Sequence, residues 1–146
     1  MTTVSLRILR PEAARLNVSA KATLDAARTL RVALQQFLGD HGVNAAAVPD
    51  IQVAAGEALN NAIEHAYGAA AGLVHLGGWY EGSTLVVEVR DDGRWRAERR
   101  ERRGGHGIKI MRALASRVEL TTTEAGTVVR MEFSDASCAA EDRRAP

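Results

Sequence analysis

Residues 57–67 read EALNNAIEHAY and decide how this chain of 146 residues is interpreted. The segment is rich in helix-forming residues, and its polar side chains recur every four positions. Glu57, Asn61 and His65 therefore share one face of a predicted helix. Leu, Ile or Val would occupy this stripe if the helix only packed against a core, so the stripe indicates a polar site.

Glu57 and Asn61 carry the side chains expected of a base beside a hard metal ion. A carboxylate can orient a nucleophile or accept its proton. A carboxamide oxygen can complete the shell of a magnesium ion that water and phosphate otherwise hold. The spacing alone leaves a second interpretation open, in which the pair only holds the helix to a loop. His65 fits a core histidine bonded to a backbone carbonyl equally well, and we assign it no role.

Three later segments complete a recognisable pattern. Residues 85–93 (LVVEVRDDG) predict a strand that ends in an acidic turn, and residues 104–111 (GGHGIKIM) predict a glycine loop entering a helix. Residues 126–133 (GTVVRMEF) predict a glycine turn followed by a strand. With residues 57–67, they resemble in order and spacing the four sequence boxes of the GHKL (histidine-kinase-like) ATPase superfamily. Within it, the chain is most similar to the anti-sigma-factor serine/threonine kinases, over roughly residues 14–133.

The resemblance implies a role for each matching residue. It implies that Glu57 is the general base and that Asn61 is the ligand of Mg²⁺. Asp91 would accept a hydrogen bond from the exocyclic amine of adenine, which guanine does not offer at that position, and so select ATP over GTP. Gly93 would let the backbone pass close beneath the base. Thr127 would support the adenine contact through its hydroxyl, although a threonine in a strand is also unremarkable.

The glycine loop is the expected phosphate site. Gly105, Gly107 and Ile108 stand where free backbone amides at a helix start would point toward the nucleotide phosphates. Residues 94–103, with six arginines and two glutamates, occupy the position of the family's ATP lid. We expect most of these arginines to face solvent, with one or two reaching phosphate or an acidic partner, and the lid to be mobile without nucleotide.

The remaining pattern predicts the fold. Apolar periodicity predicts helices over residues 22–38, 49–67 and 107–116. One or two short strands are predicted within residues 5–9 and 15–19, and further strands over residues 73–80, 84–90, 117–123 and 127–133. Because strands outnumber helices and hairpins dominate, we expect a two-layer α/β (α+β) sandwich with a mixed, mostly antiparallel sheet and helices on one face. The resemblance implies the same architecture, the Bergerat-type ATP-binding fold. We expect one domain over residues 1–133 and a disordered tail over residues 134–146.

Hydrophobic content, cysteine count and net charge argue against a membrane-spanning, secreted or nucleic-acid-binding protein. A hydrophobic content of 46% supports a real core, and no run approaches the roughly 20 apolar residues of a membrane span. No signal peptide is evident, and the single cysteine, Cys138, fits a reducing compartment, so we expect a cytoplasmic protein. A net charge of +1 argues against direct binding to nucleic acid.

The resemblance implies an ATP-dependent serine/threonine protein kinase that acts as an anti-sigma factor. It would bind a sigma factor, phosphorylate a small anti-anti-sigma partner and form a homodimer. Phosphorylation would add charge to the partner's interface and release it, which is the logic of a partner switch. The alternative from another class is a non-catalytic, ATP-dependent protein-binding regulator. The ATPase half of a histidine kinase is less favoured, because no dimerisation helix with a phosphorylatable histidine precedes the domain.

Overall fold

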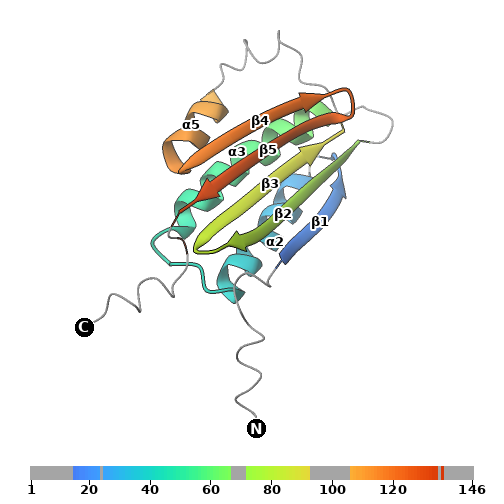
Figure 1. The fold of residues 1–146 in the computed structure, drawn as a ribbon. Coiled ribbons are helices and arrows are strands. Elements are labelled where there is room, and N and C mark those ends of the chain that lie inside the picture. The colour runs from blue at the N-terminus through green and yellow to red at the C-terminus, as the bar shows by residue number, and fades with distance from the viewer. Residues whose placement is uncertain (1–14, 24, 67–71, 93–105, 135, 137–146) are drawn as a thin grey trace, which may run out of the picture.

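A computed structural model describes residues 15–23, 25–66, 72–92, 106–134 and 136, and Figure 1 shows how they are arranged. Within these residues, five strands form one sheet in the order β1-β2-β3-β5-β4. The strands are β1 (Arg15–Lys21), β2 (Leu73–Glu81), β3 (Thr84–Asp91), β4 (Arg117–Thr123) and β5 (Gly126–Phe133). The helices are α2 (Ala26–Asp40), α3 (Val48–Ala66) and α5 (His106–Leu114).

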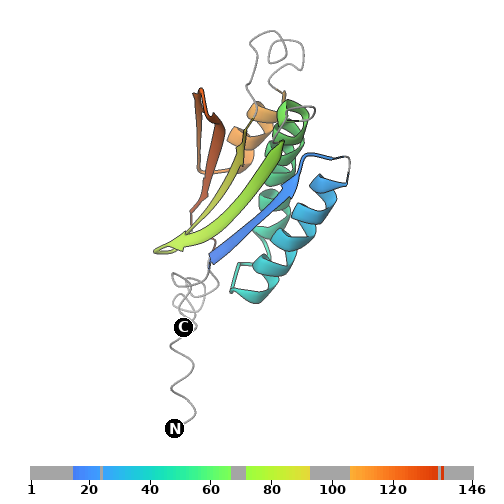
Figure 2. The same ribbon diagram turned by 90° about the vertical axis from the view of Figure 1, so that its right-hand side faces the viewer.

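The elements form two layers. Figure 2 shows the sheet as one layer and the three described helices as the other, all on the same face of the sheet. Each strand pairing in the described residues is antiparallel. The predicted α/β sandwich is therefore confirmed, and the parallel pairing that a mixed sheet would include is absent from the described part of the chain.

Two helix boundaries differ from the prediction. The helix predicted over residues 22–38 begins at Ala26, because the amide of Ala22 is still bonded to the sheet edge, donating to the carbonyl of Gly72 (2.6 Å). The helix predicted over residues 107–116 ends at Leu114, because the amide of Ser116 already donates to the carbonyl of Glu132 in β5 (2.7 Å). At Ser116 a bond to β5 thus takes the place of a helical bond, whereas at Ala22 the backbone still bonds to the segment that leads into β2.

Some predicted features lie outside the described residues. They include the strand over residues 5–9 and residues 137–146 of the expected tail. Of the residues that were assigned to the tail, Ala136 is buried, and its carbonyl accepts a hydrogen bond from the amide of Asn44 (2.6 Å). No described helix is both long enough and apolar enough to span a membrane.

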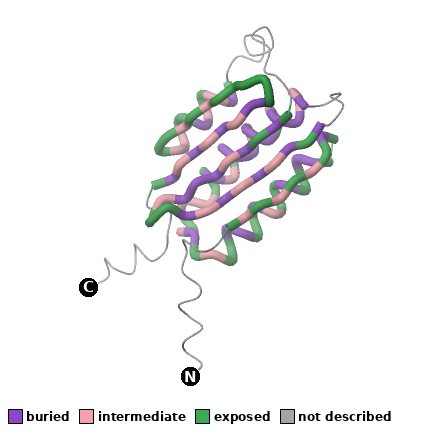
Figure 3. The backbone as a smooth tube through the Cα atoms, turned by 45° about the vertical axis from the view of Figure 1, so that its right-hand side comes forward, coloured by how far each residue is buried: buried purple, intermediate pink, exposed green. Residues whose placement is uncertain are grey.

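The core lies between the sheet and the helices. Buried and more exposed residues alternate along β2 and along most of β5, as period-2 side-chain direction requires (Figure 3). The side chains that face the helices are aliphatic, and those of α3 are mostly alanine, which lets this helix lie close to the sheet. The fully buried set includes Leu30, Leu34, Ile51, Ala54, Ala55, Ala58, Leu59, Val74, Leu76, Val87 and Met131. The core is therefore largely aliphatic.

The opposite, open face of the sheet is organised around Trp79. The guanidinium of Arg15 lies 4.7 Å from the ring centroid, and the indole Nε1–H donates to Glu81 Oε2 (3.0 Å). Arg130 donates to the other oxygen of Glu81 (2.9 Å). The bonds from Trp79 and Arg130 lower the pKa of the Glu81 carboxyl. Val86, which pairs with Trp79 in register, is fully buried although it faces this side.

The backbone of Gly126, in the β4–β5 turn, packs directly against the end of β3. Gly126 has a φ of 137°, and a Cβ added to it would overlap the carbonyl oxygen of Asp91. We predict that Gly126→Ala lowers the free energy of unfolding by about 2–5 kcal/mol, because backbone strain and a clash with backbone add together. Chemical denaturation followed by circular dichroism would measure the loss.

Gly82, in the β2–β3 turn, is the matched control for this substitution. It also has a positive φ, 64°, but a Cβ there would meet no atom within 4 Å. Gly82→Ala should therefore cost only the conformational strain, about 1–2 kcal/mol. Equal losses for the two variants would contradict the close approach of Gly126 to Asp91.

Candidate functional site

The polar stripe of α3 is present as the sequence predicts. Glu57, Asn61 and His65 are each half-buried, while Ala58 and Ala62 on the sheet-facing side are buried. The stripe therefore lies beside the core instead of inside it. A carboxylate and a carboxamide one helical turn apart are held in a partly desolvated position, where their interactions with an ion or a substrate are stronger than in bulk water.

The start of α5 meets this stripe at Gly107. A Cβ built on Gly107 would lie 3.0 Å from Asn61 Nδ2 and 3.2 Å from Glu57 Oε1. A side chain here would require Asn61 or Glu57 to shift by a few tenths of an ångström, so glycine lets α5 begin close to both groups. The first amides of a helix have no intrahelical acceptor and carry the positive end of the helix dipole. The acid, the amide and the first turn of α5 therefore converge.

Of the other residues predicted for the nucleotide site, the structure describes only some. Ile108 follows in α5 and packs, partly buried, against the core. Gly93, Gly105 and the arginine-rich segment over residues 94–103 lie outside the described residues. The predictions made for them, including a mobile lid, remain predictions.

Asp91 and Thr127 form a second polar pair at the end of the sheet. They are paired in register between β3 and β5, with 4% and 1% of their surfaces exposed. Among the described residues, Asp91 and Thr127 are the two polar or charged residues that are buried. Thr127 Oγ1 has no hydrogen-bond partner within the described part of the chain. An unsatisfied buried hydroxyl costs about 1–3 kcal/mol, so this atom fits a site completed by a ligand or by water.

Both polar pairs lie on the helix side of the sheet. Asp91 and Thr127 alternate with Arg90 and Val128, which face the open side, and Val74, the neighbour of Asp91 in register, is fully buried. Helix α3 packs on both β3 and β5. The two polar pairs, which come from α3 and from β3 and β5, therefore lie on the same side of the sheet.

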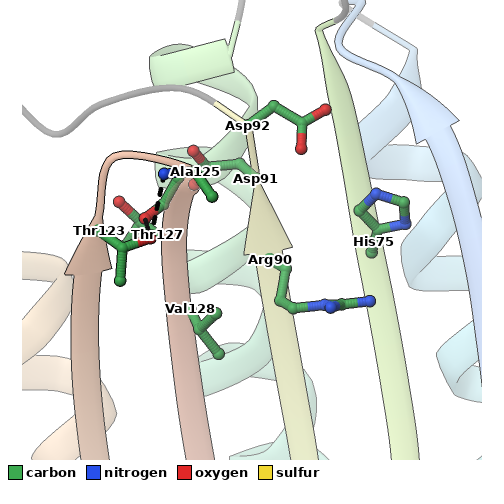
Figure 4. Close-up of a pocket in the computed structure, with 9 residues that line it drawn as sticks. His75, Arg90, Asp91, Asp92, Thr123, Ala125, Thr127 and Val128 are labelled. Atoms are coloured by element: carbon green, nitrogen blue, oxygen red, sulfur yellow. Dashed lines mark hydrogen bonds between the residues drawn. The ribbon is translucent and has the colours of Figure 1, made fainter.

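A hollow of about 240 Å³ lies at this end of the sheet, and Asp91 and Thr127 are among the residues that line it. Figure 4 shows His75 and Arg90 side by side on β2 and β3, beside the β4–β5 turn. His75 Nδ1 is 2.6 Å from Ser19 Oγ, and Asp92 Oδ2 accepts a hydrogen bond from the amide of Leu73 (3.3 Å). Sequence reasoning did not single out these residues, because their proximity depends on strand register and not on local spacing.

The described residues hold no cluster of three or more His, Cys, Asp or Glu side chains that could bind a metal ion. A magnesium ion at Asn61 would therefore take most of its ligands from phosphate and water, which is the usual manner for this ion.

Comparison with known proteins identifies the family. The sequence profile described as the histidine kinase-like ATPase domain matches residues 20–133. The chain belongs to this family. The resemblance to the GHKL ATPase superfamily is thereby confirmed, and a domain of this family implies that the chain binds ATP.

Two solved structures are similar to this histidine kinase-like ATPase domain. One is a crystal structure of the RsbU and RsbW domains of Rv1364c from Mycobacterium tuberculosis, with a TM-score of 0.65 and 26% identity, covering 83% of this chain and 32% of that one. The chain thus spans about a third of that protein's length. The other is the histidine kinase domain of the blue-light activated histidine kinase from Erythrobacter litoralis EL346, with a TM-score of 0.56 and 22% identity, covering 87% and 70%. The second likeness supports the fold alone.

The hypothesis that Asp91 recognises adenine gives a direct prediction. Losing a charged hydrogen bond costs about 1.5–3 kcal/mol, so Asp91→Ala should lower Mg-ATP affinity roughly ten- to 150-fold. Calorimetric titration with Mg-ATP and Mg-GTP would measure this. Asp92→Ala, the adjacent and exposed carboxylate, is the control and should keep ATP affinity. Equal wild-type affinity for the two nucleotides would refute the assignment.

The contact at Gly107 predicts opposite effects on stability and binding. In Gly107→Ala the new methyl group displaces Glu57 or Asn61 by a few tenths of an ångström, which should weaken Mg-nucleotide binding roughly ten-fold. Stability should not fall, because alanine is the better helix former by about 1 kcal/mol. Thermal unfolding without nucleotide and calorimetry with it would separate the two effects. Gly39→Ala in α2, where a Cβ would contact nothing within 4 Å, should leave affinity unchanged.

Proposed function

We propose that the chain is an ATP-dependent serine/threonine protein kinase that acts as an anti-sigma factor. It would phosphorylate a small anti-anti-sigma partner and hold a sigma factor when that partner is released. The observation that carries the proposal is the convergence of Glu57, Asn61 and Gly107, with Cβ-to-side-chain distances of 3.0 and 3.2 Å. The motif resemblance to anti-sigma-factor kinases supports it, as does the likeness to a structure that includes an RsbW domain.

The described residues fit a bound nucleotide. Gly107 leaves open the space that a Cβ would fill at the helix start, and Thr127 Oγ1 is a buried hydroxyl in need of a partner. Asp91 would read the base, Thr127 would support that contact, and the first amides of α5 would hold phosphate. When bound, ATP would supply the phosphoryl group, and its magnesium ion would supply positive charge.

Glu57 would act as the general base. Its carboxylate would accept the proton of the partner's serine or threonine hydroxyl as the hydroxyl oxygen bonds to the γ-phosphorus and the bond to the ADP oxygen breaks. Such a base contributes typically about 10² to 10⁴ in rate. Asn61 would present its amide oxygen to Mg²⁺, one helical turn from the base, so that metal and proton acceptor keep a constant spacing.

The partner switch follows from the charge added by phosphorylation. A phosphoryl group brings about −1.5 to −2 charges at pH 7 to the partner's interface, which weakens its binding and leaves this protein to hold the sigma factor. As further parts of the proposal, the protein would work in the cytoplasm and as a homodimer, without direct contact to nucleic acid.

Substitution of the base separates a kinase from a non-catalytic regulator. Glu57→Gln keeps the size of the side chain and one acceptor oxygen but removes most of its basicity. We predict near wild-type ATP affinity and a loss of phosphoryl transfer of about 10²-fold or more. The measurement is transfer of label from γ-labelled ATP to anti-anti-sigma proteins encoded beside the gene, with nucleotide affinity measured in parallel.

Glu88→Gln is the matched control. Glu88 is also half-buried but lies on the open face of β3, where its register partner is Arg130. The Glu88→Gln variant should transfer phosphate to the partner at the wild-type rate. If Glu57→Gln is as fast as the wild type with chemistry rate-limiting, the base lies elsewhere. If the wild type binds ATP and the partner but transfers nothing, the ATP-dependent binding regulator replaces the kinase.

A further inference from the structure

In the described part of the chain, three arginines on the open face of the sheet each precede an acid by two residues. They are followed here with their acids: Arg90 and Asp92 at the end of β3, Arg117 and Glu119 on β4, and Arg130 and Glu132 on β5. Residues two apart on a strand point to the same side, with Cα atoms about 6.5 Å apart. Each arginine therefore has an acid within reach of its own strand.

Two of these three combinations are closed ion pairs, and the third is open. On β4 and β5 the distances from arginine Nε to the carboxylate oxygen are 3.1 Å and 3.2 Å. Arg90 forms no ion pair within the described residues. Asp92 is one methylene shorter than glutamate, and its Oδ2 atom accepts the amide of Leu73 on β2 (3.3 Å). A cation and a carboxylate therefore remain apart at this end of the sheet.

The hollow of about 240 Å³ is lined by both separated charges. Figure 4 shows Arg90, Asp92 and His75 gathered over β2 and β3, and Val128 on the neighbouring strand β5. The β4–β5 turn closes another side of the hollow. Sites for drug-sized ligands measure about 300–1,000 Å³, so this hollow suits a smaller molecule.

His75 adds a second hydrogen-bond donor beside Arg90. Ser19, His75, Arg90 and Val128 stand in one row across four strands, because each is the register partner of the next. His75 Nδ1 lies 2.6 Å from Ser19 Oγ, which leaves Nε2 for a ligand. In the tautomer in which the hydroxyl donates to Nδ1, Nε2 carries the hydrogen and can donate it. Val128 is half-buried and offers an apolar contact.

We infer that this hollow binds a free α-amino acid with an apolar side chain. The ligand's carboxylate would pair with Arg90 and accept a hydrogen bond from His75 Nε2, and its ammonium group would pair with Asp92. The ligand's side chain would cover Val128. A zwitterion satisfies both separated charges at once, whereas a simple anion would meet the carboxylate of Asp92 as a like charge.

The amino-acid site adjoins the nucleotide site without sharing its side chains. Asp91 and Thr127 also line the hollow. Their side chains alternate with Arg90 and Val128 along the strands and so point to the helix layer. An amino acid on the open side and a nucleotide on the helix side can therefore be bound together. The site would serve a kinase and a non-catalytic regulator alike, because it does not involve Glu57.

Calorimetric titration of the whole protein with L-leucine tests the site, and amide chemical shifts locate the bound molecule. Arg90→Gln and Asp92→Asn should each weaken leucine binding roughly ten-fold or more, because each removes one charged partner. Arg117→Gln, from the closed pair on β4, is the matched control and should leave the affinity unchanged. Absence of leucine binding up to about 10 mM would overturn the inference.

Two analogues of leucine separate recognition from a structural effect. Isocaproate lacks the ammonium group and isoamylamine lacks the carboxylate, so each should bind the wild type roughly ten-fold more weakly than leucine. Asp92→Asn should not weaken isocaproate further, and Arg90→Gln should not weaken isoamylamine further. If either variant weakens all three ligands alike, that residue shapes the hollow without contacting the ligand, and the assignment is wrong.

A competition experiment separates this site from the nucleotide site. With Mg-ATP present at saturation, leucine affinity should change by no more than about two-fold. Displacement of leucine by Mg-ATP would place it in the nucleotide site and overturn the inference. Loss of phosphoryl transfer in Glu57→Gln with leucine binding intact would leave this site standing, since the two measurements depend on different residues.

Discussion

The candidate site depends on the absence of a side chain where α5 meets α3. Gly107 brings the first turn of α5 to within contact distance of Glu57 and Asn61, which come from a helix about 50 residues earlier. The contact places the positive end of the dipole of α5 beside the polar stripe of α3, which favours a negatively charged group next to Glu57 and Asn61. Buried alanines on the sheet-facing side of α3 pack against the core and so fix the distance between the polar stripe and the sheet. The carboxylate, the carboxamide and the helix start are therefore positioned by helix packing and not by loops.

Much of this arrangement could be predicted from local sequence. The spacing of Glu57 and Asn61 specifies one helical face, and the structure shows both half-buried on that face. The two hairpins were predicted from their strands, and Gly82 and Gly126 in their turns adopt positive φ values that other residues rarely take. Helix α3 was also located closely, since Pro49 falls in the first turn of the observed helix.

What could not be predicted depends on contacts between distant segments. The pairing of Asp91 with Thr127 requires β5 to lie between β3 and β4, and no local pattern reports this order. The start of α2 was misplaced because a bond from Ala22 to Gly72 is invisible in the sequence around residue 22. Nothing in the sequence distinguishes Arg31 from other surface arginines, whereas in the structure its side chain lies beside Gly56 of α3.

The open face of the sheet provides an optical reporter that is separate from the site. Trp79 is one of two tryptophans in the chain, and its ring lies beneath the guanidinium of Arg15 with its N–H bonded to Glu81. Indole emission depends on the charge and water around the ring. In a chain whose other tryptophan is replaced by phenylalanine, the fluorescence of Trp79 would report what covers this face of the sheet. Changes around Glu57, on the other side of the sheet, would not alter that fluorescence.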